Sequence, residues 1–136
     1  MWHLRLIVGV GLVSLCGCAP GSALSSQDTI LGGDWGGVHA GLALTPERGT
    51  ISYDCGHGGL YAPVRPNQAG RFEVAGVHVR EHGGPVRLGA IPDSVPARYI
   101  GQVTGDSMEL RVLVGPDTLG PFTLVRGAAP RLFRCL

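Results

Sequence analysis

The stretch Met108-Glu-Leu-Arg-Val-Leu-Val114 decides the fold class. Apolar residues occupy every second position of this stretch, and the charged residues Glu109 and Arg111 stand between them. Because successive side chains of a β-strand point to opposite faces of the sheet, this alternation predicts a half-buried antiparallel strand.

Shorter runs elsewhere in the chain repeat the same period of two, and no segment shows sustained helical spacing. Their apolar positions are Val38/Ala40/Leu42/Leu44, Ile51/Tyr53/Cys55, Tyr99/Gly101/Val103 and Phe122/Leu124. Between residues 72 and 79 the apolar positions change parity, from Val74 to Val77. This slip predicts a β-bulge at Ala75-Gly76 that bends the strand.

Turn residues divide these runs at intervals of roughly ten residues, a spacing typical of a small sandwich or barrel. Counting the runs gives seven strands, with residues 131–136 as a candidate eighth. The sequence therefore predicts an all-β fold, a small antiparallel meander β-barrel of about seven or eight strands with a lipocalin-like general plan. Small residues on the expected inward faces, Ala40, Gly76 and Gly101, leave open whether side chains fill the barrel or it holds one small ligand.

Length and composition exclude several classes of protein. The chain has 136 residues, with 11 Arg, no Lys, 10 acidic residues and a formal charge of +1. This balance lacks the basic footprint of a nucleic-acid-binding protein, and 136 residues suffice for only one domain. The length and the 23 Gly and 10 Pro residues also exclude a TIM barrel, a two-domain Rossmann enzyme and a coiled coil.

The N-terminus reads as a targeting signal. Arg5 supplies a positive charge, and the apolar run from Leu6 to Leu15 is too short to cross a hydrocarbon core about 30 Å thick. The run leads into Leu15-Cys16-Gly17-Cys18, which resembles the lipobox of bacterial lipoproteins.

The resemblance implies that Cys18 is the lipidated residue. Cys16 fits this position less well, because Leu15 stands where the signal peptidase of the family takes a small residue. The mature chain would begin at Cys18 and be fastened to a membrane through its acyl chains. Ala19 follows Cys18, and the retention signal of enterobacterial lipoproteins is Asp at that position, so we expect the outer membrane, facing the periplasm. The alternative is cleavage after Ala23, which would give a secreted or soluble periplasmic protein.

These boundaries divide the chain into three parts. Residues 1–17 are expected to be a lipoprotein signal peptide, residues 18–33 a flexible lipidated tether, and residues 34–136 the β-barrel domain. Two cysteines remain in the mature domain, Cys55 and Cys135, and in an oxidising compartment they should form a disulfide. A reactive or metal-binding thiol is the alternative.

No catalytic constellation stands out in the sequence. There is no G-x-S-x-G motif and no phosphate-binding glycine loop, and we expect no cofactor. The glycines around Trp35, at positions 32, 33, 36 and 37, precede no helix. We therefore expect them to let another part of the backbone approach closely, and we expect Trp35 to cap a mouth of the barrel.

Three histidines, His57, His78 and His82, are weak candidates for a metal site. If residues 78–82 are extended, the Cα atoms at their two ends lie about 13 Å apart, too far for both imidazoles to share one zinc ion without a turn. We therefore expect these histidines to make ordinary hydrogen bonds.

The best candidate for a functional surface is the long connection from Glu81 to Ala97. It mixes charged and apolar residues, which suits contact with a partner or cover for an opening; a mobile excursion or a stabilising lid is the alternative. The candidate binding residues of this loop and its flanks are Arg80, His82, Arg87, Asp93 and Arg98.

Two kinds of resemblance bear on function. The combination of a lipobox, a compact barrel and a Cys near the C-terminus is similar to bacterial membrane-bound lysozyme inhibitors, and Ala97-Arg98-Tyr99 resembles part of their Ser-Gly-x-x-Tyr loop. The residues before that tripeptide are Val95-Pro96, which do not match the loop of the inhibitors, so the resemblance does not imply their inhibitory contact for this chain. The segments Trp35-Gly-Gly-Val-His39 and Gly83-Gly-Pro-Val-Arg87 resemble those of uncharacterised bacterial envelope proteins.

The sequence thus favours a non-catalytic binding module in the cell envelope. Its expected partners are the membrane, through the lipid, and either a protein or a small apolar ligand, but not nucleic acid. One alternative is a metal-binding or enzymatic protein using His57, His78 and His82, and another is a structural component of the envelope.

Overall fold

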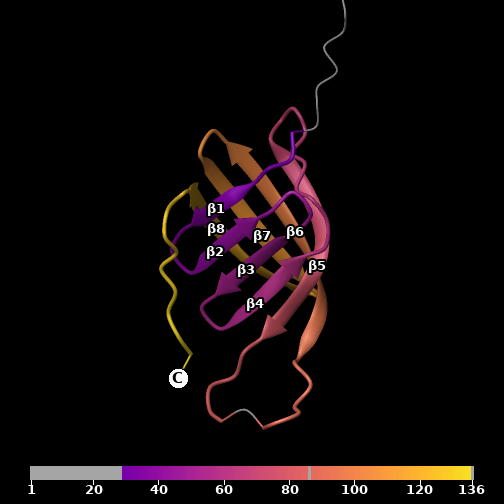
Figure 1. Ribbon diagram of the computed structural model, residues 1–136, viewed down its shortest axis with the longest axis vertical. Helices are drawn as coiled ribbons and strands as arrows, with labels where there is room; N and C mark the ends of the chain where they lie inside the picture. Colours follow the sequence, from indigo (N-terminus) through magenta and orange to yellow (C-terminus); the bar gives the residue numbers. More distant parts are fainter. Residues whose placement is uncertain (1–28, 86, 136) are drawn as a thin grey trace, which may run out of the picture.

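The computed structural model describes residues 29–85 and 87–135, and these residues form a closed antiparallel barrel of eight strands. Each strand pairs with the next along the chain, and the last pairs with the first (Figure 1). The predicted meander barrel is therefore confirmed. The strands are β1 (Gly33–Gly36), β2 (Ala40–Leu44), β3 (Gly49–Tyr53), β4 (Gly56–Leu60), β5 (Arg71–Arg80), β6 (Ser94–Thr104), β7 (Ser107–Val114) and β8 (Asp117–Arg126).

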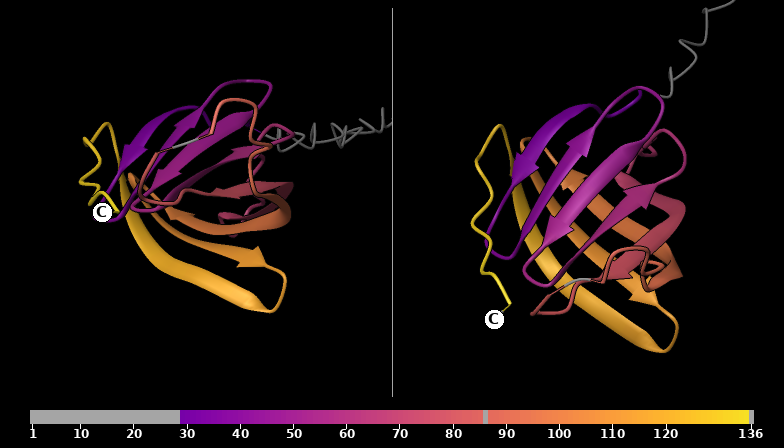
Figure 2. Two further views of the ribbon diagram at one scale, coloured as in Figure 1. Left: turned by 90° about the horizontal axis from the view of Figure 1, so that it is seen from below. Right: turned by 60° about the horizontal axis from the view of Figure 1, so that its bottom comes forward.

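The barrel has two distinct ends (Figures 1 and 2). The chain enters at one end, where Leu31 forms an isolated bridge with Val64. At the opposite end, which we call the disulfide end, lie the turns between β1 and β2, β3 and β4, and β7 and β8, together with the long loop from Glu81 to Asp93. Among the described residues no helix is long and apolar enough to span a membrane.

The alternation that decided the fold class holds in β7, where Met108, Leu110 and Val112 are buried and Glu109 and Arg111 are exposed. The predicted bulge at Ala75-Gly76 is wrong, because β5 pairs with β6 in one continuous register.

The register irregularity instead lies between β7 and β8, at Leu110 and Val112. In β5 the inward positions run Phe72, Val74, Gly76 and His78. The apparent slip in the sequence arose because a glycine and a histidine occupy inward positions while Val77 faces outward.

Side chains fill the barrel, and aromatic side chains in it pack directly against glycines. A Cβ atom at Gly58 would lie 2.1 Å from the Tyr99 hydroxyl, and one at Gly101 would lie 2.2 Å from the Phe72 ring. The Tyr99 hydroxyl donates a hydrogen bond to Val77 O at 2.7 Å. The largest fully buried side chains are Trp35, Tyr99, Leu42, Ile51, Leu60, Met108, Leu110, Leu124, Val64 and Val112.

The segment after β8, residues 127–135, is a strap that lies on the outside of the barrel along β1 and β2 (Figure 2). A Cβ atom at Gly36 would lie 2.1 Å from Ala128 O, and one at Gly41 would lie 2.7 Å from Pro130 Cβ, so glycines allow the strap to approach closely. The strap makes one isolated bridge, between Arg131 and Val38, and is not the eighth strand that we predicted. The glycine-rich strands β1 and β4, which lack large alternating residues, complete the barrel instead.

Two further boundaries differ from the sequence prediction. Leu31 donates a backbone hydrogen bond to Val64 O at 2.8 Å and Gly33 begins β1, so the last residues of the predicted 18–33 tether belong to the barrel. Strand β6 begins at Ser94, which shortens the predicted connection to residues 81–93. The predicted signal peptide 1–17 and the lipidated Cys18 lie outside the described residues.

The glycine packing gives a stability prediction. Replacement Gly76→Ala places a Cβ atom 2.0 Å from the Gly59 carbonyl oxygen, a backbone atom that cannot move cheaply. We expect a loss of about 3 kcal/mol of unfolding free energy, measured by urea denaturation. The control is Gly59→Ala, whose nearest contact is 3.7 Å away. Equal stability of the two variants would contradict the account of the core.

Candidate functional site

A disulfide joins the strap to the turn after β3. Cys55 and Cys135, whose Cα atoms lie 5.4 Å apart, are bonded as the sequence predicted. Cys55 lies between β3 and β4, so the bond fastens the end of the chain to the disulfide end of the barrel.

Hydrogen bonds centred on Asp54 fasten the same strap. Asp54 Oδ1 accepts a hydrogen bond from the Phe133 amide at 2.8 Å, and Asp54 Oδ2 lies 2.5 Å from His39 Nδ1. The bond from the Phe133 amide is the main reason why the pKa of Asp54 is lowered, and His39 lowers it further. The His39 amide in turn donates to Arg131 O at 2.9 Å.

His39 itself has a φ of 74°, in the left-handed region that residues other than glycine seldom adopt. Through the hydrogen bonds described above, His39 and Asp54 both hold the strap. We call the disulfide and these hydrogen bonds the clasp.

Beside the clasp, at the disulfide end of the barrel, is a cavity of about 570 Å³. Its volume suits a small molecule, since pockets for such ligands span about 300 to 1,000 Å³. We call it the mouth cavity. Its lining residues are His39, Tyr53, Asp54, Cys55, His78, Arg80, Glu81, Thr118, Leu119, Gly120, Phe122 and Cys135.

Two residues of this lining each have a buried polar atom without a hydrogen-bond partner, the Tyr53 hydroxyl and His78 Nδ1, and both atoms lie beneath the cavity surface. Tyr53 is 8% exposed and His78 is 7% exposed, and their rings lie 5.4 Å apart. Most buried polar side chains in proteins find a partner, because leaving one unpaired costs about 1–3 kcal/mol. These are the only two such atoms in the part of the chain that the structure describes.

Both groups are neutral at physiological pH, and burial favours the neutral form of each. Desolvation lowers the pKa of His78, and the positive charges of Arg80 and His57 lower it further. Desolvation likewise raises the pKa of Tyr53 far above its ordinary value. Two uncharged polar groups therefore lie in the core directly beneath the cavity.

Arg80 is the next inward-facing residue of β5 after His78, but it stands at the open end of the strand and is exposed. Its guanidinium makes no hydrogen bond and no ion pair within residues 29–85 and 87–135. The neighbouring acid Glu81 is engaged elsewhere, since its Oε1 lies 2.7 Å from His57 Nδ1.

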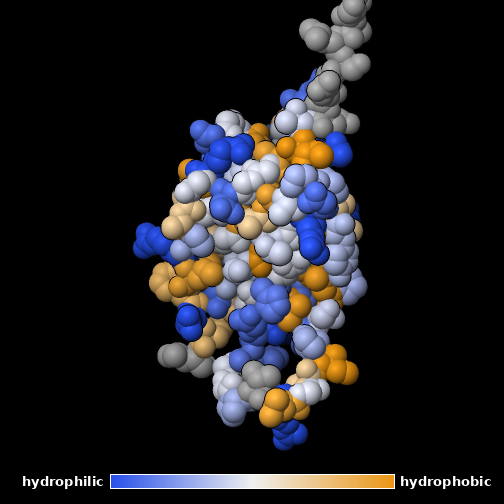
Figure 3. Space-filling model, viewed as in Figure 1, coloured by the Kyte–Doolittle hydropathy of each residue, from blue (hydrophilic) through white to orange (hydrophobic). Residues whose placement is uncertain are grey.

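The long loop encloses a second cavity of about 770 Å³ next to the mouth cavity. Four of the five predicted binding residues, Arg80, His82, Arg87 and Asp93, line it together. Arg98 does not, because it lies on the outer face of β6 with its Nε 2.7 Å from Glu73 Oε1. Figure 3 shows apolar side chains on this loop, at the bottom of the view, where Leu88 and Ile91 are almost fully exposed.

The three candidate metal ligands are not brought together. Gly58 pairs with His78 and His57 pairs with Val79, so His57 and His78 lie on opposite faces of neighbouring strands. His57 is exposed and His78 is buried. Among the described residues, no group of three or more His, Cys, Asp or Glu side chains is placed to hold a metal ion.

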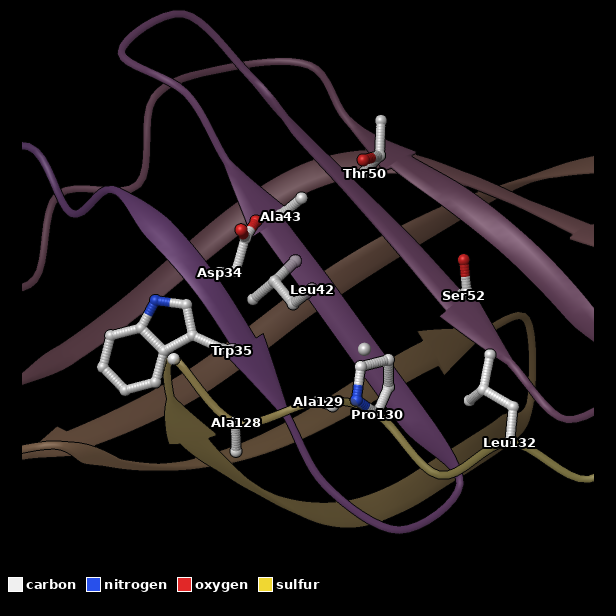
Figure 4. A pocket seen from close by; sticks show the side chains of 12 residues that line it. Asp34, Trp35, Leu42, Ala43, Thr50, Ser52, Ala128, Ala129, Pro130 and Leu132 are labelled. Atoms are coloured by element: carbon white, nitrogen blue, oxygen red, sulfur yellow. The ribbon is translucent and has the colours of Figure 1, made fainter.

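A third hollow, of about 390 Å³, lies between the strap and the outer face of β1, β2 and β3 (Figure 4). Thr50 and Ser52 border it on the strand side, and Pro130 and Leu132 border it on the strap side. It contains no buried unpaired polar atom, so it is a weaker candidate for a ligand site than the mouth cavity.

Sequence reasoning missed most of the mouth cavity. It treated His78 as a weak metal candidate that makes ordinary hydrogen bonds, which is wrong because His78 is buried with Nδ1 unpaired, and it did not select Tyr53 or Phe122. One signal in the sequence could have indicated this site. In β5 the period of two, continued past Gly76, places both His78 and Arg80 on the inward side of the strand.

Comparison of the chain with protein-family models, with curated proteins and with solved structures finds no match.

The buried His78 predicts a pH dependence of stability. Because its pKa is lowered in the folded state, the unfolded chain binds a proton more readily. The stability that neutral His78 contributes is complete above the ordinary histidine pKa of about 6.5 and declines as the pH falls from there toward the folded pKa.

Replacing the histidine should remove this decline. We expect urea unfolding from about pH 7.5 to 5 to show a steeper loss of stability for the wild type than for His78→Phe, which cannot titrate. Parallel pH profiles for the two proteins would show that His78 is not held neutral by burial.

Proposed function

We propose that this protein is a non-catalytic binding module of the bacterial cell envelope, whose ligand site is the mouth cavity. The observation that carries the proposal is an open cavity of small-molecule size whose lining combines the Tyr53 and Phe122 rings with a few polar side chains. An apolar cavity with a few placed polar groups is the usual form of a small-molecule site.

The filled interior supports the mouth as the place of binding. Tyr99, Met108 and Leu110 are fully buried in the barrel, so a ligand of appreciable size has no room beneath the mouth. A ligand would rest on the Tyr53 and Phe122 rings, whose centroids lie 5.7 Å apart. This differs from a hollow lipocalin-like barrel, which encloses its ligand.

A protein partner is the second candidate for the occupant. Leu88 and Ile91 project from the loop at the same end of the barrel, where a partner would cover them. The enzymatic or metal-binding alternative has less support, since His57 and His78 lie on opposite faces of the sheet.

The envelope location rests on the lipobox resemblance of Leu15 to Cys18. Leu31 enters the barrel at the end opposite the mouth cavity, so the lipid anchor proposed at Cys18 would join the chain on the side of that opposite end. Its test is the intact mass of the purified chain, where a mature mass without acyl chains contradicts the anchor.

The binding proposal is tested with the neutral aromatic probe N-phenyl-1-naphthylamine. We expect it to shift the backbone amide NMR signals of Tyr53, His78 and Phe122 in the full chain, because these residues line the mouth cavity. Replacing the half-buried Leu119 with the larger Trp should occupy the cavity and weaken binding at least about tenfold.

The matched control is Leu132→Trp, which adds the same side chain to the strap outside the mouth cavity. It should bind the probe as the wild type does. The wild-type protein alone can contradict the proposal. It would do so if the probe shifted only the signals of the long loop, or shifted no signals at all.

A further inference from the structure

We propose that the ligand of the mouth cavity is a small amphipathic carboxylate, with its acid group on Arg80 and its apolar body on Tyr53, Leu119 and Phe122. This inference rests on the proposed function and goes beyond it by naming the chemical class of the ligand. The juxtaposition that carries it is an unpaired guanidinium and a group of apolar side chains in the lining of one cavity.

These apolar side chains are suited to a flat or extended apolar group. Tyr53 is inward-facing at the end of β3, and Phe122 and Leu119 face inward from β8, where both are partly buried against the core. The Tyr53 and Phe122 rings are inclined at 35° to each other. An apolar group placed on these side chains would bury surface that the filled barrel leaves uncovered.

Arg80 supplies the positive charge that a carboxylate needs, in the lining of the same cavity as these apolar side chains. It lines the mouth cavity and the adjoining loop cavity, and its backbone amide is fixed by a hydrogen bond to Asp93 O at 3.2 Å. A guanidinium presents a planar pair of donors that matches a carboxylate in two hydrogen bonds.

The surrounding acids leave Arg80 available. Both oxygens of Asp54 are engaged by Phe133 and His39, and Glu81 is engaged by His57. Asp93 lies on the loop side of Arg80 and forms no ion pair with it. None of these three carboxylates pairs with Arg80, so within the described residues its guanidinium is open to the acid group of a ligand.

The core beneath the cavity adds no competing charge. The pKa of His78 is lowered by burial, so the imidazole is neutral and does not compete with Arg80 for the acid group. The size of the cavity, about 570 Å³, favours a free small molecule over the carboxyl end of a protein chain.

Three probes with one apolar body and different head groups test the inference: 4-phenylbutyrate, 4-phenylbutan-1-ol and 4-phenylbutylamine. Dissociation constants are measured by NMR titration of the full chain, following the amides of Tyr53, His78 and Phe122. We expect the carboxylate to bind about tenfold more tightly than the alcohol, and the amine to bind most weakly.

Variants then assign the preference to Arg80. Arg80→Gln should weaken the carboxylate about tenfold and leave the alcohol unchanged, and Arg80→Lys should restore part of the loss. The control is Arg111→Gln, because Arg111 lies on the outer face of β7 with its Nη2 2.8 Å from Glu109 Oε1. It should leave all three constants unchanged.

The outcomes separate the two proposals. Equal affinity of the three probes at the mouth, or an Arg80→Gln variant that loses nothing, overturns the ligand class and leaves the binding site standing. Absence of binding by every probe, together with absence of the neutral naphthylamine signal, overturns the binding function itself. A C-terminal peptide amide that binds as well as its free acid would likewise exclude recognition of the acid group.

Discussion

The structure depends on the clasp that holds the end of the chain against its own barrel. Strand β1 has four residues, and it pairs with β8 only through Trp35 with Arg126 and Gly36 with Val125. This is a short seam for a closed sheet. It is reinforced by the Arg126 guanidinium, 4.3 Å from the centroid of the Trp35 ring, and by the Gly127 amide, which donates to Asp34 O at 2.7 Å.

The disulfide carries this reinforcement to the opposite end of the barrel. Cys55 and Cys135 are 80 residues apart, and closing a loop of that length removes chain entropy worth about 4.5 kcal/mol from the unfolded state. That amount approaches the whole net stability of a small domain. With only three Phe and three Tyr in 136 residues, the chain offers few large rings for its core, so the covalent bond supplies stability that packing alone would have to provide.

The same clasp shapes the candidate site. His39, Asp54, Cys55 and Cys135 all line the mouth cavity as well as holding the strap. Any molecule in the cavity therefore contacts the part of the chain that closes the barrel. The proposed binding and the stability of the barrel therefore involve one small set of residues.

Large apolar residues in alternation made much of the fold predictable. The alternating runs, clearest in β7, and the turn residues between them predicted the barrel, and the pair Cys55 and Cys135 predicted its disulfide. Glycine caused the errors, because a glycine on an inward face leaves no side chain to mark the period. Gly76 produced a false bulge, and β4, with three glycines among five residues, escaped recognition as a strand.

The site was harder to predict than the fold, because its residues come together only when the barrel closes. Tyr53 and Phe122 lie on β3 and β8, far apart in the sequence, and nothing local marks them as neighbours. The charged residues near the long loop were easier to select, and Arg80 is the one that lines the mouth cavity as well. Arg98, selected for its place beside the loop, faces outward and pairs with Glu73, since β6 begins earlier than its proline suggested.

The dependence of the barrel on the clasp is tested most directly by hydrogen exchange with the disulfide intact and reduced. The account predicts that reduction speeds exchange at the amides of His39, Gly127 and Phe133 and lowers the unfolding free energy by about 4 kcal/mol, while the long β6–β7 pairing remains the best protected. Unchanged exchange at these amides together with unchanged stability would contradict it.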